Sequence, residues 1–120
     1  MDEFALIDEV VKQLGDRAQG GWVKLGPGDD AAVIQQTAGH EAVASIDTLV
    51  VGVHFPDTMA AADIGYRAMM VGLSDLAAMG AEPRYVLAAV TLPTADRQWT
   101  VELARGMAEA AVGKVTAASI

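Results

Sequence analysis

The chain has 120 residues, of which 52% are hydrophobic and only 5% aromatic, so it can form one domain with an aliphatic core. Its formal net charge of -8 argues against binding to nucleic acid, which requires clustered Lys and Arg. The lack of cysteine excludes disulfide bonds, thiolate metal sites and cysteine nucleophiles.

The N-terminal half predicts one helix followed by extended segments. A helix is expected over about 3–14, because apolar residues recur there at helical spacing and Gly15 follows as a stop. The runs AAVIQQ and EAVASID predict a β-hairpin with Gly39 in its turn. The next run, TLVVGVHF, is expected to remain extended, with a bulge or a close backbone approach at Gly52.

A long helix is predicted next, over about 60–79, with Thr58 as its cap and Gly80 at its C-terminal stop. After a turn at Glu82-Pro83, the run RYVLAAVTL is rich in β-formers and predicts a buried strand.

Pro93 and Thr94 are expected to open a last helix over about 95–112, with Trp99, Leu103 and Ala110 on one face. The final residues, VGKVTAASI, have the composition to begin a further strand. The order of elements predicts an α+β fold, in which helices pack on one face of a mixed or antiparallel sheet.

The chain begins MDEFALIDEVV, which is acidic where a signal peptide requires basic residues. No apolar run reaches the roughly 18 residues that a membrane span requires. We therefore expect a cytoplasmic protein that does not associate with a membrane.

The stretch LGPGDDAAVI places two aspartates, Asp29 and Asp30, between a Gly-Pro-Gly turn and an apolar run. Adjacent carboxylates are unfavourable at the start of a strand, because they repel each other and are depleted there. Gly26 and Gly28 leave backbone amides accessible to a phosphate. Either the turn is merely acidic, or it holds a divalent cation with phosphate behind it. The usual glycine-rich nucleotide motifs are absent from the sequence.

Ser45 and Asp47 lie two residues apart at the end of an extended run, so both project from the same face. A carboxylate and a hydroxyl placed together can bind a hard cation, although Asp47 could instead simply begin a turn. A Ser-His-Asp triad of Ser45, His54 and Asp47 is possible on paper, but nothing marks Ser45 as an activated nucleophile.

Asp75 lies at helical spacing on a face of small and apolar residues, so it is expected to be buried. A buried carboxylate requires a cation or strong donors, and an ion pair with Arg67 or Arg84 is the structural alternative to a metal. His54 lies between Val53 and Phe55 and, without a ligand, would be an exposed strand histidine.

Three motifs together resemble the N-terminal domain of the thiamine-monophosphate kinase family: GPGDDAAV, SIDTLVVGVHF and LSDLAAMGAEP. This family belongs to a superfamily with aminoimidazole ribonucleotide synthetase, selenophosphate synthetase and a hydrogenase-maturation protein. The similarity runs through roughly residues 3–110, and the second motif is the most specific to the kinase. The resemblance implies an aminoimidazole ribonucleotide synthetase-like fold and the ATP-dependent phosphorylation of thiamine monophosphate to thiamine diphosphate.

The resemblance also implies the roles of individual residues. The ligands of Mg²⁺ would be Asp30, Ser45, Asp47 and Asp75, together with the backbone carbonyl of Ile46. Relatives often carry a threonine at position 46. His54 would contact the substrate, and Gly26, Gly28 and Asp29 would contact ATP. No catalytic base is implied, because a phosphate monoester is already largely ionised at neutral pH.

The resemblance further implies a homodimer, for which the apolar stretches AAADIGYRAMM and YVLAAVTL would supply surface. Family members continue with a strand ending in Gly-Gly-Asp-Thr and a second domain, whereas AAVGKVTAASI does not match. Residues 1–120 are therefore expected to be a single, truncated N-terminal domain that is inactive alone. The alternatives are a non-catalytic dimerisation or metal-binding module, or a relative of the hydrogenase-maturation protein.

Overall fold

The computed structural model describes residues 2–15, 23–28, 30–111 and 117–119, the last three by their backbone only. Its elements, in chain order, are α1 (Glu3–Leu14), β1 (Val23–Leu25), β2 (Val33–Ile34), α2 (Ala61–Ala78), β3 (Tyr85–Leu87), α3 (Arg97–Ala111) and β4 (Ala117–Ser119). The fold is α+β, as predicted. The described part contains no helix with the length and apolarity needed to cross a membrane.

The first helix, α1, has the predicted bounds because its two ends carry clear local signals. The carboxylate of Asp2 accepts a hydrogen bond from the Ala5 amide at 2.8 Å and so caps the first turn. Gly15 ends the helix. Val10 and Leu14 are buried in a small cluster with Ala104 of α3, which holds α1 against that helix.

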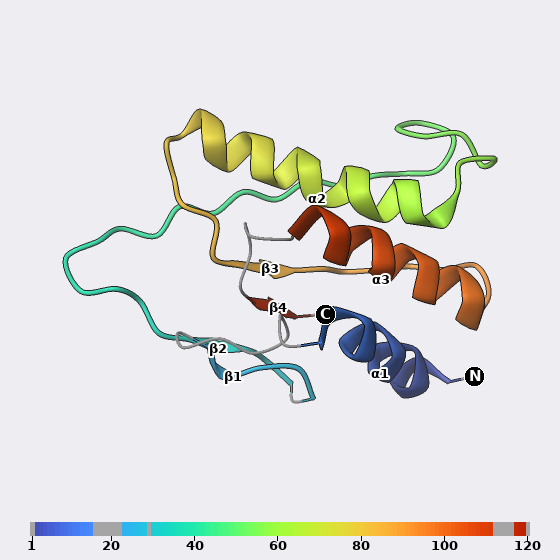
Figure 1. Ribbon diagram of the computed structural model, residues 1–120, viewed down its shortest axis with the longest axis horizontal. Helices are drawn as coiled ribbons and strands as arrows, with labels where there is room; N and C mark the ends of the chain where they lie inside the picture. Colours follow the sequence, from blue (N-terminus) through green and yellow to red (C-terminus); the bar gives the residue numbers. More distant parts are fainter. Residues whose placement is uncertain (1, 16–22, 29, 112–116, 120) are drawn as a thin grey trace.

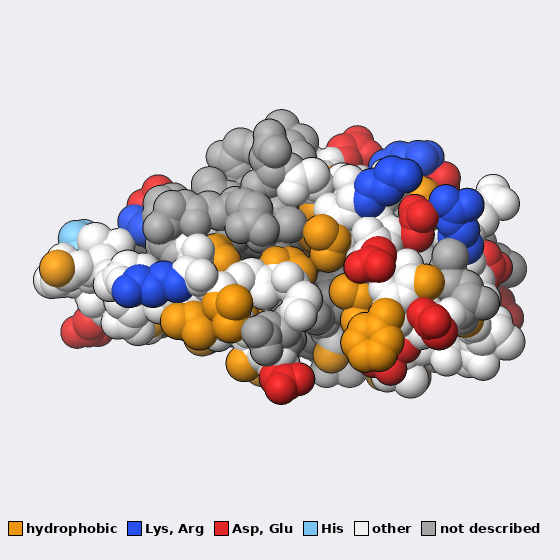
Figure 2. Space-filling model, turned by 90° about the horizontal axis from the view of Figure 1, so that it is seen from below, with side chains coloured by type: hydrophobic (Ala, Val, Ile, Leu, Met, Phe, Trp, Pro, Cys, Tyr) orange, Lys and Arg blue, Asp and Glu red, His pale blue; other side chains and the backbone are white. Residues whose placement is uncertain are grey.

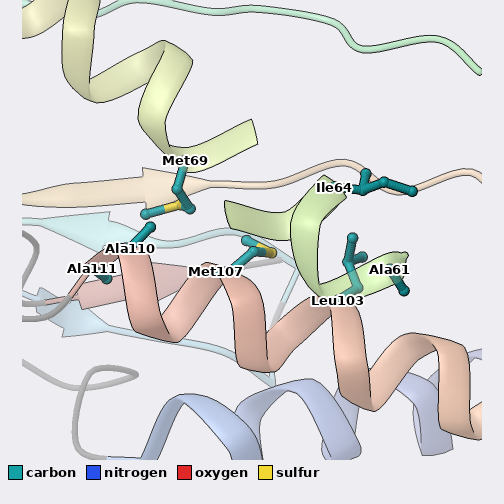
Figure 3. Close-up of a cluster of buried hydrophobic side chains, with 7 residues drawn as sticks. All are labelled: Ala61, Ile64, Met69, Leu103, Met107, Ala110 and Ala111. Atoms are coloured by element: carbon teal, nitrogen blue, oxygen red, sulfur yellow. The ribbon is translucent and has the colours of Figure 1, made fainter. Parts of the chain in front are cut away.

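The three helices lie side by side with α3 in the middle, in contact with α2 and with α1 (Figure 1). The main core forms between α2 and α3 (Figure 3). Its buried side chains are Ala61, Ile64, Met69, Leu103, Met107, Ala110 and Ala111. On the opposite side of α3, an ion pair at 2.8 Å between Arg97 of α3 and Glu9 of α1 links α3 to α1.

Two glycines allow the backbones of α2 and α3 to touch. A Cβ atom built on Gly65 would overlap the carbonyl oxygen of Leu103, and one on Gly106 would overlap that of Ala62. Because each glycine faces backbone of the opposite helix, no side chain can move aside to make room. The stretch AAADIGYRAMM, expected to form a dimer surface, is thus largely used inside the chain.

The start of α2 differs in detail from the prediction, and its end agrees with it. Thr58 is not the cap: the helix starts after Ala60, which makes no side-chain capping bond. The C-terminus ends at Gly80 as expected, because Gly80 adopts a φ of 67°. The amides of Gly80 and Ala81 then donate to the carbonyls of Ala77 and Leu76, at 3.0 and 2.9 Å, and reverse the chain.

The last helix, α3, starts at Arg97, two residues later than predicted. Its cap is Asp96, whose carboxylate accepts a hydrogen bond from the Trp99 amide at 3.1 Å. Asp96 was missed because Pro and Thr a few residues earlier gave an equally good local signal. Leu103 and Ala110 are buried and Trp99 is half-buried against the same cluster, which agrees with the prediction that they share one face.

The predicted hairpin between residues 31–36 and 41–47 is wrong. Val33–Ile34 pairs instead with the earlier strand Val23–Leu25, in antiparallel orientation. Gly39 does lie in a turn, closed by a 3.2 Å bond from the His40 amide to the Thr37 carbonyl. Among the described residues, 41–50 belong to no strand, and they run along α2 in the opposite direction (Figure 1).

A second two-stranded sheet consists of β3 and β4 in parallel orientation, which confirms the further strand expected at the end of the chain. The strand predicted as buried at RYVLAAVTL is only three residues long, and only one of its faces is partly buried. Val86 packs against the helices, whereas Tyr85 and Leu87 are exposed, Leu87 by 67%. The described strands therefore form two small sheets instead of the single sheet expected.

We predict that Gly106→Ala destabilises the domain by at least about 1–3 kcal/mol, because the added methyl group would force α2 and α3 apart. Gly72→Ala is the matched control, since nothing lies within 4 Å of a Cβ at this helical glycine. The control should be neutral or more stable by about 0.5–1 kcal/mol, from helix propensity. Urea unfolding followed by circular dichroism measures both, and equal stability of the two variants would contradict the predicted contact.

Candidate functional site

Ser45 and Asp75, thirty residues apart in sequence, are brought together in the structure. The Ser45 hydroxyl donates a hydrogen bond to Asp75 Oδ2 at 2.9 Å. Asp75 lies in the last turn of α2, and Ser45 lies in the segment 41–50 that runs along this helix. The bond therefore links an otherwise irregular segment to a rigid element.

Asp75 is exposed, which corrects the expectation that it would be buried. The buried residues of α2 all lie in its first half, between Ala61 and Met69, where α3 packs against it. Met79, on the same expected face as Asp75, is 71% exposed. Arg84, one of the partners considered for Asp75, forms an ion pair with Glu82 at 3.6 Å.

The neighbours of Ser45 in the second motif are also on the surface. Ile46 is 94% exposed, and Asp47 is exposed next to it. Exposure of a large aliphatic side chain to this degree gains nothing from the hydrophobic effect, so Ile46 does not contribute to the core of the domain. Its backbone, which the resemblance proposes as a ligand, is not engaged in a described strand.

The first motif forms a turn, as its glycines indicate. Gly26 precedes the turn at Pro27 and Gly28, and Gly28 has a φ of 110°. Asp30 follows in an exposed bend, while Asp29 lies outside the described residues. The structure thus places Asp30 directly after a tight turn, where the sequence put it.

His54 does not lie on an extended strand, as had been expected, but in a compact turn. Gly52 adopts a φ of 80°, and its amide donates to the Phe55 carbonyl at 2.7 Å. The amides of Val53 and His54 donate to the carbonyl of Val50. The Val50 amide in turn donates to Nδ1 of His54 at 2.9 Å, so the exposed imidazole is held by the backbone.

The predicted ligands do not all converge in the described part of the chain. Among those residues, no group of three or more His, Asp and Glu side chains lies close enough to hold a metal ion. On the face drawn in Figure 2, the carboxylates are spread over the surface and lie among Lys and Arg at one end. The pair of Ser45 and Asp75 is the part of the predicted set that the structure joins.

A cavity of about 750 Å³ lies beside this pair, and sequence reasoning did not find it. It is open to solvent on one side and is lined by three stretches of the chain: residues 34–46, α2 between Ala68 and Leu76, and residues 79–87. Ser45 and Ile46 are part of its lining, together with apolar residues of α2 such as Leu73 and Leu76. No local pattern signals such a cavity, because it depends on how the three stretches are placed relative to one another.

Comparison with known proteins connects these residues to a family. A family model described as "AIR synthase related protein, N-terminal domain" matches residues 28–114, which include all three motifs except Gly26 and Pro27.

The chain is also similar to proteins named thiamine-monophosphate kinase. It is 40% identical to the one from Haemophilus influenzae over 101 residues, which cover 82% of the chain and 30% of that relative. Identity is 47% over 77 residues with the Escherichia coli protein, covering 64% of the chain and 24% of the relative. It is 36% over 110 residues with the Bacillus subtilis protein, covering 91% and 32%. The chain thus spans between a quarter and a third of the length of these relatives.

Proposed function

The chain belongs to the family of AIR synthase related proteins, as an N-terminal domain, and from this we propose that it forms part of a thiamine-monophosphate kinase. The proposed reaction is the transfer of a phosphoryl group from ATP to thiamine monophosphate, giving thiamine diphosphate. The observation that carries the proposal is the similarity to three relatives of that name across the motif-bearing residues.

The chemistry of the proposed reaction agrees with the residues available. The acceptor is a phosphate monoester, whose second pKa is about 6, so it is already a nucleophile at neutral pH. The protein then needs to position two anionic substrates in line and does not need a general base. This requirement is consistent with a site made of carboxylates, a hydroxyl and glycine turns.

We propose that Mg²⁺ is the cofactor and that Asp30, Ser45, Asp47 and Asp75 hold it, with the backbone carbonyl of Ile46. Oxygen donors of this kind are those that magnesium prefers, and the 2.9 Å contact of Ser45 and Asp75 supports the placement of two of them in one site. When bound, magnesium would offset the repulsion between the phosphate groups of the two substrates.

The remaining motif residues are proposed to bind the substrates. Gly26, Gly28 and Asp29 would contact ATP, because a glycine turn allows close approach of backbone amides to phosphate. His54 would contact thiamine monophosphate through its exposed imidazole. Residues 1–120 would then act as the N-terminal domain of a longer enzyme, inactive by itself.

The assay that tests this function supplies ATP and Mg²⁺ to the full protein that contains this domain. We predict that thiamine monophosphate is converted to thiamine diphosphate, whereas free thiamine and aminoimidazole ribonucleotide precursors are not converted. Turnover of one of those other substrates in place of thiamine monophosphate would overturn the assignment. The isolated 120-residue chain should remain at background, because it lacks most of the length of its relatives.

Magnesium binding can be tested on the isolated chain by thermal melting. We predict that Mg²⁺ stabilises the chain by about 0.4 kcal/mol when its concentration equals the dissociation constant, and by about 1.4 kcal/mol at ten times that concentration. Asp75→Asn should abolish most of this gain. Asp63→Asn, which changes an exposed aspartate in the first turn of the same helix, is the control and should keep it. An identical magnesium response in both variants would remove Asp75 from the proposed ligands.

We also propose that the domain is a homodimer. Support comes from exposed apolar side chains in two regions. These are Val43, Ile46, Val50, Val51 and Val53 in residues 43–53, and Tyr85, Leu87 and Val90 in and after β3. Light scattering of the isolated chain at micromolar concentration should give twice the 12.5 kDa monomer mass. Ile46→Asp should shift it toward the monomer by placing a charge in the interface, and a monomeric wild-type chain would contradict the proposal.

A further inference from the structure

The two histidines of the chain are held by the backbone in opposite ways. His54 Nδ1 lies 2.9 Å from the amide nitrogen of Val50, which can only donate a hydrogen bond. His40 Nδ1 lies 3.1 Å from the carbonyl oxygen of Ala38, which can only accept one. An imidazole nitrogen that accepts must be free of hydrogen, and one that donates must carry it. Nδ1 therefore carries no hydrogen in His54 and carries one in His40.

The contact at His54 is part of a closed arrangement between this residue and Val50. The Val50 carbonyl accepts from the His54 amide at 2.9 Å, while the Val50 amide donates to the His54 ring at the same distance. Gly52, at a φ of 80°, lets the chain turn between them. His54 thus bonds to both backbone groups of Val50, and its ring is held at the Nδ1 side.

We propose that Val50 is a positioning residue that holds neutral His54 in the tautomer with hydrogen on Nε2. The exposed edge of the imidazole then presents an N–H donor to a ligand. The inference rests on the proposed function for the identity of that ligand: the group on thiamine monophosphate that meets His54 is a hydrogen-bond acceptor, either a phosphate oxygen or a pyrimidine ring nitrogen. His54 in this state cannot accept a proton from the substrate through Nε2 without first losing its bond to Val50.

The tautomers can be read directly from the isolated chain. Two-bond nitrogen–proton correlation spectra of chain labelled with ¹⁵N-histidine, at mildly alkaline pH, distinguish protonated from unprotonated ring nitrogens. We expect hydrogen on Nε2 in His54 and on Nδ1 in His40, so that the two residues show mirror-image patterns. Hydrogen on Nδ1 of His54, or an even mixture of tautomers there, would overturn the proposal.

Two substitutions at Val50 separate its amide from its side chain. Val50→Pro removes the N–H and should shift His54 toward a mixture of tautomers, whereas Val50→Ala keeps the N–H and should leave the pattern unchanged. An unchanged pattern in a folded Val50→Pro chain would show that the amide does not set the tautomer. If Val50→Pro does not fold, the spectrum of the wild-type chain still decides which tautomer His54 adopts.

The ligand side is tested by titrating thiamine monophosphate into the full protein. His54→Gln retains an amide N–H near the position of Nε2, and His54→Asn retains an acceptor near Nδ1 but does not reach the ligand. We expect His54→Asn to bind about tenfold more weakly and His54→Gln to recover most of that loss. Equal loss in both variants would overturn the assignment of a donor role. A wild-type protein that does not bind thiamine monophosphate would refute the proposed substrate. The proposed tautomer of His54 would then still be tested by the nitrogen–proton spectra.

Discussion

The backbone contact between α2 and α3 is the constraint on which the rest of the domain depends. Gly65 and Gly106 bring the two helices closer than side chains would allow, and the aliphatic core forms around that contact. Since α2 continues without a break from Gly65 to Asp75, the contact at Gly65 also fixes the position of Asp75, which lies ten residues or about 15 Å further along the helix. Val86 packs against this helical layer and so places β3 beneath it.

Helices could be predicted well because their signals are local. Asp2 and Gly15 bound α1, and Gly80 ends α2 through bonds to residues within one turn. Errors at helix starts were small and had the same origin, since Thr58 and Thr94 are good caps that lie near the real start without occupying it. Strand pairing is not local, so Val33–Ile34 could have paired with residues on either side, and alternation of apolar residues did not distinguish them.

The candidate site was predictable only as far as motifs identify residues. The motifs singled out Ser45 and Asp75, which the structure joins, but they gave no measure of exposure. Asp75 was expected to be buried because its helical neighbours are small and apolar. Whether it is buried depends on how far α3 extends along α2, and the residues around Asp75 carry no information about that. The turn at His54 was missed for a related reason: valines on both sides of Gly52 favour a strand, and the glycine overrides them.

The valines of residues 48–55 have a consequence for the chain before it folds. Residues 48–55, TLVVGVHF, combine high β-propensity with little charge, which is the composition of a segment that stacks into cross-β aggregates. Asp47 and Asp57 flank this stretch and are both exposed. Their charges repel when identical segments come into register, so they act as gatekeepers against aggregation.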